Sequence, residues 1–540
     1  MKLKQHFLFL LTIVTISSYV HTMCPPNELE LGCCTQREKI RFEQFWATEQ
    51  QSRREKQSES FMFTRPIYRN IAIQQSLWHD FVYNKKCPLG GAFQVVGMYQ
   101  KSLENDSVDR YFLFNDSTTL IVKGDNAPAI PPRNRDIRAE WIGLPADFIG
   151  TFSINPQQRQ AAVWLEYNQD LYPFCRYDFL KPFWVSIAAP VQFVENDISI
   201  SQMTAQNPNP NPEPQPQDII EALNQPNWNY GKFGGQEKEV ALAEVFLKLG
   251  ARFLNRNGFQ IGMYNFVNFP LHNAQNAEYI FSPFIGHNRH FGYGNGLTFQ
   301  LPINCSNDFM FAFVFNIENI RFFSNKQHRS IDLKEKPWSR YLLLNNKDGR
   351  KNVPGINVLT QKVSVNPFNM VDLEGAFRFQ TANIEAEVGY CLWAHGDERV
   401  KLTEPWKEEW GIAGDGALVP GTTIGATASK STICNQACND VAIDPVTCRP
   451  TIPINPVTCA DVQNPTQLYT FVPIKEQDLD FLAASARAAL VNRVHAAFGV
   501  FTNKKAAFAG FIGAGGYAEI PKNNTALFNW GVWGKFGGRF

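Results

Sequence analysis

The sequence predicts an all-β protein: a transmembrane antiparallel β-barrel of roughly 12–16 strands, with a short N-terminal helical region and long loops. From Gly91 onward, apolar and polar residues alternate along successive segments. After residue 23, no stretch is apolar for the ~18 residues that a spanning helix needs. The chain ends on an alternating aromatic segment, Leu527–Phe540. A chain that crosses a membrane with strands must close them into a barrel, because hydrocarbon leaves no partner for a free backbone N–H or C=O.

The first 23 residues are typical of a secretory signal peptide. Lys2 and Lys4 precede a short apolar segment, Phe7–Ile16, and small polar residues follow it. That segment is too short to span a bilayer. We therefore expect a signal peptide at residues 1–23.

Residues 24–90 are expected to form an N-terminal periplasmic or plug-like extension, and a solvated extension is the alternative. Arg37–Lys56 is charged and helix-prone. The barrel is expected over residues 91–540, with long insertions at residues 199–236 and 400–480.

Four segments show the alternation most clearly, at residues 160–168, 308–318, 371–380 and 384–393. Successive side chains of a strand point to opposite faces, so each segment has one apolar and one polar or charged face. A soluble sandwich also alternates, but paired charges on the polar face are typical of a wet lumen. The candidate pore-lining residues are Glu166, Glu244, Lys248, Arg252, Asp372, Glu374, Arg378, Glu385, Glu387, Lys535 and Arg539.

Connections of two lengths separate these segments. Asn255–Gly258 and Thr502–Lys505 are predicted to be tight turns, whereas the two insertions are long. Short turns at one end and long loops at the other are typical of outer-membrane barrels. Val240–Leu254 and the second half of Ala483–Ala497 are predicted to be strands, and Asp218–Leu223 a short helix.

The last strand carries its own signal. Residues of even number from Phe528 to Phe540 share an apolar face, and Lys535 and Arg539 lie on the other. Trp530, Phe536 and Phe540 resemble the C-terminal signature that the barrel assembly machinery reads in outer-membrane proteins. That machinery is therefore an expected partner.

Three segments resemble a family of uncharacterised, porin-like outer-membrane β-barrels from intracellular bacteria. They are Asn529–Gly537, Tyr279–Gly292 and Glu140–Tyr167. The resemblance runs from about residue 137 to the end of the chain and leaves out the part before about Lys86. It implies the fold and a location in the bacterial outer membrane, and it brings no catalytic or binding residues.

Other motifs are read as structural. Gly513-x-Gly515-x-x-Ala518 matches a dinucleotide fingerprint by letter, but Pro521 follows where a helix should begin, so we expect a packed strand. His287 and His290 have no third ligand nearby in sequence and are expected in a polar turn. We predict no catalytic residue, no cofactor and no metal site.

The chain has 11 cysteines, and an exported protein usually pairs them. The disulfide candidates are Cys434, Cys438, Cys448 and Cys459. The formal net charge of +1 gives no electrostatic footprint for nucleic acid.

The leading functional hypothesis is a porin-like channel for passive diffusion of small solutes, without enzymatic activity. Its expected partners are outer-membrane lipid and those solutes. The alternatives are a plugged barrel that serves as a surface-display or adhesion scaffold, a barrel-based hydrolase that uses paired carboxylates, and a soluble secreted β-protein.

Overall fold

The computed structural model describes residues 58–83, 89–103, 106–127, 135–175, 177–206, 216–306, 309–436, 443–444, 449–450, 470–502 and 508–540. All of them belong to one compact unit. The predicted signal peptide and the helix-prone Arg37–Lys56 lie outside the described residues. Among the described residues, no helix is long and apolar enough to cross a membrane.

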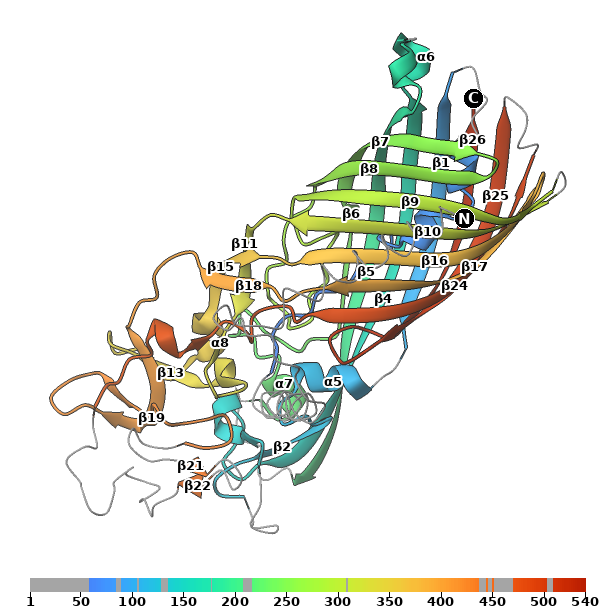
Figure 1. The fold of residues 1–540 in the computed structure, drawn as a ribbon. Coiled ribbons are helices and arrows are strands. Elements are labelled where there is room, and N and C mark those ends of the chain that lie inside the picture. The colour runs from blue at the N-terminus through green and yellow to red at the C-terminus, as the bar shows by residue number, and fades with distance from the viewer. Residues whose placement is uncertain are drawn as a thin grey trace, which may run out of the picture. The chain divides into compact units, whose positions relative to one another are not determined.

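Strands form a closed antiparallel barrel in the described part of the chain (Figure 1), which confirms the predicted fold class. Its twelve strands, in order around the wall, are β1 (Gly91–Ser102), β4 (Ile149–Asp170), β5 (Phe183–Gln206), β7 (Glu244–Arg256), β8 (Phe259–Pro270), β9 (Gly292–Cys305), β10 (Phe309–Phe322), β16 (Asn369–Thr381), β17 (Ile384–His395), β24 (Ala489–Phe501), β25 (Ala509–Pro521) and β26 (Asn529–Arg539).

The C-terminal strand closes the wall, as predicted. β26 pairs with β25 on one side and with β1 on the other, in register from Ala92 opposite Arg539 to Ser102 opposite Asn529. Gly91 and Phe540 exchange two backbone hydrogen bonds of 3.0 Å each. Trp530 and Phe536 point outward and are exposed. Closure leaves neither strand with an open edge.

The two faces of the wall follow the predicted alternation. On β16, Phe377 and Phe379 point outward, and Arg378 is fully buried inside. The same pattern holds in β4, β10, β17 and β26. Large apolar side chains therefore cover the outer surface, and polar side chains cover the inner one.

The connections have different lengths at the two ends of the barrel. The end that carries Phe540, here called the turn end, includes the two-residue turn Asn257–Gly258 between β7 and β8. Both residues have positive φ, 53° and 79°, as a type I′ hairpin turn requires. This confirms the predicted tight turn, whereas residues 503–505 of the other predicted turn lie outside the described part.

The long connections gather at the opposite end and fold together as a cap (Figure 1). Its helical elements are α5 (Asp106–Phe112), η1 (Ala139–Ile142), α7 (Ile219–Ala222), η3 (Ser339–Tyr341), α8 (Gly355–Leu359) and η5 (Glu476–Asp478). Its strands are β2 (Thr119–Lys123), β3 (Ile137–Arg138), β11 (Asn325–Ser330), β12 (Asp332–Leu333), β13 (Leu343–Asn346), β14 (Val353–Pro354), β15 (Thr360–Asn366), β18 (Arg399–Leu402), β19 (Trp410–Leu418), β20 (Gly425–Thr427), β21 (Ile443–Asp444), β22 (Arg449–Pro450) and β23 (Leu479–Asp480).

Two features join the cap to the wall. β4 and β5, with 22 and 24 residues, are about twice as long as the ~9–11 residues that a tilted membrane strand needs. β2 pairs with β4 near its start, and β6 (Gln236–Leu242) pairs with the middle of β5.

At the turn end, α6 (Tyr172–Cys175) and η2 (Asp178–Leu180) connect β4 to β5.

The cap has an apolar core of its own. Trp338 lies at its centre, is fully buried, and donates a hydrogen bond of 2.8 Å from its indole N–H to the carbonyl oxygen of Phe112. The rings of Phe114, Phe233 and Tyr341 surround it. Residues from connections far apart in sequence thus share one core.

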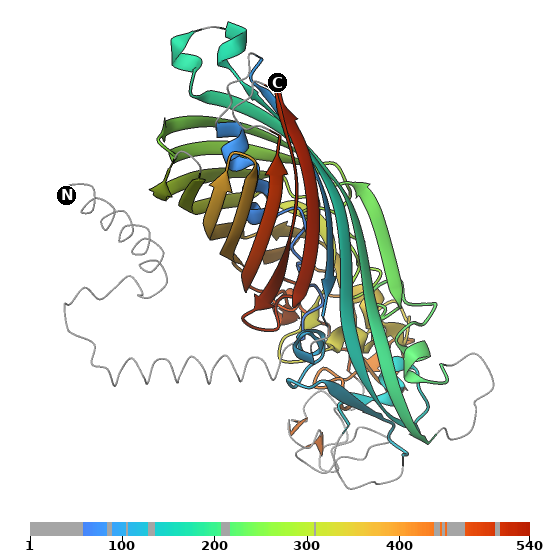
Figure 2. The ribbon, with the colours of Figure 1, turned by 90° about the vertical axis from the view of Figure 1, so that its right-hand side faces the viewer.

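Residues 58–83, here called the plug, lie inside the barrel (Figure 2). Ser58 hydrogen-bonds to Asp332 in the cap, and Phe81 contacts Phe501 and Phe511 near the turn end. The plug contains two short helices, α3 (Ile71–Gln75) and α4 (His79–Tyr83). A solvated extension is the wrong description of this part of the chain, because nearly all of its described side chains are buried.

Several local predictions are confirmed. β7 covers most of Val240–Leu254, and β24 covers the second half of Ala483–Ala497. Asp218 caps α7 by accepting a hydrogen bond from the Glu221 amide. The first insertion is shorter than predicted, because β5 runs on to Gln206.

Replacing Trp338 by alanine should unfold the cap without opening the barrel. Truncation of a buried tryptophan costs about 3–5 kcal/mol. Most of the rings around Trp338 belong to the cap, and Phe152 at the start of β4 is its ring contact with the wall. Limited proteolysis should cut W338A in the cap, while the barrel keeps its heat-modifiable mobility in SDS gels. F179A is the matched control, because Phe179 is 68% exposed at the turn end. Loss of the heat-modifiable band in W338A would show that barrel and cap fold as one unit.

Candidate functional site: the plugged lumen

The inner face of the wall carries all eleven predicted pore-lining residues. Ten of them are buried, and Arg252 is half-buried. They face the plug rather than an open channel in this structure. Whether they line a pore when the plug is absent stays a prediction.

Two arginines of the plug pair with acids of the wall. Arg65 forms an ion pair with Glu519 on β25, and Arg69 forms one of 2.8 Å with Glu318 on β10. All four side chains are at most 5% exposed. Ion pairs that are desolvated in this way hold both partners firmly, since a lone buried charge is costly. The plug is thus held from two separate parts of the wall.

Wall side chains also hold the backbone of the plug. Lys535 donates to the carbonyl oxygens of Ile73 and Ser76, the latter at 2.7 Å. Glu385 accepts a hydrogen bond of 3.0 Å from the Leu77 amide, and Asp372 accepts one of 3.3 Å from the Ile71 amide. Short helices leave amides and carbonyls without partners at their ends, and wall side chains supply these partners.

Two glycines, on the neighbouring strands β24 and β25, make room for the plug. A Cβ at Gly499 or Gly513 would collide with the side chain of Leu77. The glycine-rich sequence of β25 is therefore a packing feature of a barrel strand, as predicted, and no helix follows it.

A second polar network lies beside α3. Glu166 accepts hydrogen bonds of 2.7 Å from Gln94 and 2.8 Å from Ser186, and Lys248 lies 3.7 Å from it. Nearer the turn end, Arg252 pairs with Asp170 at 2.8 Å.

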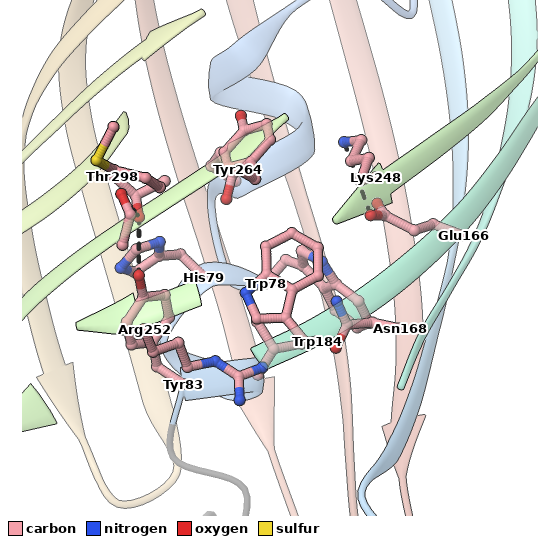
Figure 3. Close-up of a pocket in the computed structure, with 14 residues that line it drawn as sticks. Trp78, His79, Tyr83, Glu166, Asn168, Trp184, Lys248, Arg252, Tyr264 and Thr298 are labelled. Atoms are coloured by element: carbon pink, nitrogen blue, oxygen red, sulfur yellow. Dashed lines mark hydrogen bonds and ion pairs between the residues drawn. The ribbon is translucent and has the colours of Figure 1, made fainter. Parts of the chain in front are cut away.

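A small cavity separates α4 from the wall at the turn end (Figure 3). Its volume is about 30 Å³, enough for about one water molecule. Trp78 and Trp184 give it apolar sides, and Glu166, Lys248 and Arg252 give it charged ones. This cavity is too small to serve as a solute path while the plug is in place.

The two histidines of the loop between β8 and β9 have different partners. The structure brings Glu244 to His287, 2.7 Å from its Nδ1, although no acid lies near it in sequence. His290 Nδ1 lies 2.8 Å from the carbonyl oxygen of Phe323, and burial lowers the pKa of His290 to about 4. The histidine pair is therefore a polar, buried turn, as predicted.

Three of the four disulfide candidates, Cys438, Cys448 and Cys459, lie outside the described residues. Cys434 lies in the cap, with its sulfur 3.1 Å from Thr432 Oγ1. Cys305 and Cys391 carry free thiols. Disulfides in the second insertion stay a prediction.

The sequence held a signal for the plug. Residues 61–81 contain Phe61, Phe63, Tyr68, Trp78 and Phe81, a density of aromatic residues that a solvated extension would not carry. The wall partners Glu318, Glu519 and Arg493 are not among the predicted site residues. Arg493 donates a hydrogen bond of 2.8 Å to Asn70 Oδ1 in the plug. Glu318 stood on the polar face of an alternating segment, but no local pattern could show which acids meet an arginine of the plug.

No family model and no curated protein matches the chain. Among solved structures, it is similar to the COG4313 outer membrane channel from Pseudomonas putida F1, with 8% identity and a TM-score of 0.36 over 84% of this chain and 97% of that one. The β domain of the Bordetella autotransporter BrkA has 6% identity and a TM-score of 0.28, over 83% and 99% of the two chains. The CymD monoaromatic hydrocarbon channel has 8% identity and a TM-score of 0.24, over 87% and 94%. Likenesses this low carry no argument about function, and the family resemblance stays a prediction.

Replacing Arg69 by leucine should destabilise the plugged barrel. The substitution leaves Glu318 as a buried charge without its cation, which costs about 3–5 kcal/mol. Urea unfolding of the refolded protein in detergent, followed by tryptophan fluorescence, should report this loss. The double variant R69L/E318L should recover most of it, because two apolar side chains leave no unpaired charge.

Arg159 provides the control for that comparison. It pairs with Glu195 at 3.3 Å but is 47% exposed, so R159L should cost less than about 1 kcal/mol. Equal losses in R69L and R159L would contradict the view that the plug is held by buried ion pairs.

Proposed function

We propose that the protein is a gated outer-membrane channel, closed in the observed state by its plug and opened when the plug leaves the lumen. One observation carries this proposal: the lumen wall is polar and charged although the plug fills it. Apolar packing between wall and plug would be at least as stable as buried ion pairs. A polar wall can be wetted by solvent once the plug leaves, as transport through the lumen requires.

The outer surface of the barrel is the evidence for a location in the membrane. Exposed apolar side chains such as Val388, Phe377 and Phe536 cover the outward face of strand after strand. In water such a surface would cause aggregation, whereas a bilayer covers it. The aromatic closing strand agrees with export to the bacterial outer membrane. We therefore do not propose the alternative hypothesis of a freely soluble secreted β-protein.

The charge of the opened lumen suggests which solutes pass. Departure of the plug removes Arg65 and Arg69, and it leaves Glu318 without its arginine and Glu519 with Arg493 of the wall as its cation. Rings of acids favour cations in a pore. We therefore propose small cationic or neutral polar solutes as the cargo. The proposed role is transport, and the lack of enzymatic activity stays a prediction.

Planar bilayers test the gating proposal. The wild-type protein should show rare conductance steps, because the plug closes the lumen. R65Q/R69Q should increase the open fraction by about tenfold or more, since each 1.4 kcal/mol lost by the closed state is worth a factor of ten. The open state should be cation-selective in a KCl gradient. R159Q is the matched control and should behave as the wild type.

Two results would contradict this mechanism. Steady large steps in the wild type would mean that the plug does not close the channel. A silent R65Q/R69Q variant, refolded and of wild-type mobility, would remove the channel and favour the scaffold.

A second candidate, a plugged barrel that serves as a display scaffold, is favoured by the cap. Five long connections build one folded unit around Trp338, as a recognition surface would require. Long loops face the outside in outer-membrane barrels. This candidate and the channel agree on orientation and differ in whether the lumen ever opens.

Epitope tags test the orientation that both candidates share. A tag after Asp348, in an exposed turn of the cap, should bind antibody on intact cells. A tag after Asp178, exposed at the turn end, should bind only after the outer membrane is permeabilised. The reverse pattern would overturn the orientation, and equal labelling of both tags on intact cells would overturn the membrane-spanning placement.

A further inference from the structure

The wall contacts the backbone of the plug from one end of the plug to the other, and the first of these contacts is made by Gln160 on β4. The side-chain amide of Gln160 donates a hydrogen bond of 3.0 Å to the carbonyl oxygen of Arg65 and accepts one of 2.9 Å from the amide of Ile67. A side-chain amide carries the same donor and acceptor as a peptide group. Gln160 therefore binds the plug as a neighbouring strand would.

The same kind of contact recurs at the turn end. Arg539 on β26 donates a hydrogen bond of 3.0 Å to the carbonyl oxygen of Phe81, and Asn255 on β7 donates one of 2.9 Å to that of Tyr83. Between these ends, the ammonium group of Lys535 binds two further carbonyl oxygens, as described above. Every residue has such a carbonyl group, so these contacts are open to a chain of other sequence.

Arg69 of the plug lies in a site built from side chains of β7, β8 and β10. Besides its ion pair with Glu318, its guanidinium lies 5.7 Å from the ring centroid of Phe246 and 5.3 Å from that of Phe266. The hydroxyl of Tyr264 donates a hydrogen bond to the same carboxylate. These four wall side chains are buried. A carboxylate beside two aromatic rings suits a planar guanidinium ion.

The second arginine site is oriented by the wall itself. Glu519, which pairs with Arg65, also accepts hydrogen bonds of 2.9 Å each from Arg493 and Asn529. These two partners belong to neighbouring strands of the barrel, so the carboxylate is held in place independently of the plug. Arg493 already offsets the charge of Glu519, and we therefore expect the Glu318 site to contribute more of the selectivity.

Main-chain hydrogen bonds give affinity and pockets for particular side chains give specificity when a protein binds an extended peptide. The lumen wall offers both. Its backbone contacts run from Gln160 to Asn255, and its two acidic sites accept the arginine side chains of the plug. The plug is thus bound in the way that a peptide ligand is bound.

We propose that the lumen wall is a binding surface for arginine-containing peptide segments, of which the plug is the resident one. A second step rests on the proposed function: in the opened channel, short peptides of this kind are the cargo, which gives a chemical class to the small cationic solutes proposed above. The plug then excludes cargo by occupying the contacts that cargo would use.

Binding is tested on the full chain, refolded in detergent as the R65Q/R69Q variant, in which the plug has lost its ion pairs. The probe is a fluorescein-labelled synthetic peptide of residues 64–77, and fluorescence anisotropy measures its affinity. The peptide should bind this variant at least about tenfold more tightly than it binds the wild type, whose own plug occupies the sites. Replacing both arginines of the peptide by glutamine should weaken binding at least about tenfold, since hydrogen bonds to charged groups are the stronger ones.

Two further ligands define what the wall recognises. A glycine–serine peptide with two arginines at the same spacing should bind within about tenfold of the plug peptide, because it has the same backbone groups. Arginine amide should need at least about a hundredfold higher concentration to compete, because it lacks the other backbone contacts. A glycine–serine peptide that does not bind would overturn the proposal, since the lumen would then recognise only its own plug. Equal competition by arginine amide would overturn it as well, since a guanidinium site alone would then suffice.

The Glu318 site is tested on the protein side. E318Q, added to R65Q/R69Q, should weaken binding of the plug peptide at least about tenfold. E195Q is the matched control, because Glu195 pairs with Arg159 of the wall instead, and it should bind as the parent variant does. Each variant must keep the heat-modifiable mobility of the barrel. If E318Q loses it, the glutamine peptide makes the same comparison without a change in the protein, and equal affinities for the arginine and glutamine peptides would contradict the site.

Conductance separates this inference from the channel on which its second step rests. The plug peptide should block the KCl current through open R65Q/R69Q channels in planar bilayers. A variant that conducts but neither binds the peptide nor is blocked by it would overturn the peptide site and leave the channel. A variant that binds the peptide but never conducts would contradict the channel and leave the peptide site.

Discussion

Closure of β26 against β1 is the constraint on which the rest of the structure depends. The two strands meet in register, and Gly91 and Phe540 complete the ladder at its end. Without this pairing, both strands would present open rows of amides and carbonyls, which neither a membrane nor a soluble protein tolerates over such a length. Closure also fixes the size of the interior. A barrel of eight strands is just filled by its own side chains, so a wall of twelve leaves space that another segment or water must occupy.

The plug fills that space, and the way it does so follows from the wall. A strand that faces lipid on one side offers only its other face to the interior, and that face here is polar. An apolar insert would leave Glu318 without the guanidinium that pairs with it and would leave Asp372 and Glu519 to share Arg493, which is costly because all three acids are buried. The plug supplies Arg65 and Arg69 as ion-pair partners, and the ends of its helices hydrogen-bond to wall side chains. Leu77 packs closely against Gly513. Apolar residues of the plug, among them Phe61 and Trp78, occupy the remaining places.

Local pattern was enough to predict the barrel. Residues 371–380 and 384–393 alternate because one face meets an apolar environment, and the alternation is written into each strand separately. The turn at Asn257–Gly258 and the cap of α7 by Asp218 are equally local. The wall side of the candidate site was therefore predictable: all eleven predicted residues lie on the inner face.

Pairings between distant segments could not be predicted in this way. Arg69 and Glu318 are separated by almost half the chain, and His287 meets Glu244 across two strands. Nothing in the neighbourhood of either residue specifies its partner, because the register of the whole wall sets the distance. The strand count fell at the lower end of the expected range because several alternating segments build the cap rather than the wall.

The composition of the contact between plug and wall bears on whether that contact is permanent. Replacing a buried ion pair by well-packed apolar residues is often neutral or stabilising by roughly 1–4 kcal/mol. Stability alone therefore does not explain why the interior keeps arginines and glutamates. A polar contact differs from an apolar one in what happens when it separates. Water can solvate both surfaces, so the open state is less costly than it would be for two exposed apolar surfaces. The folded cap, which contacts the start of the plug through Ser58 and Asp332, is placed where a change at the loop end could reach the plug directly.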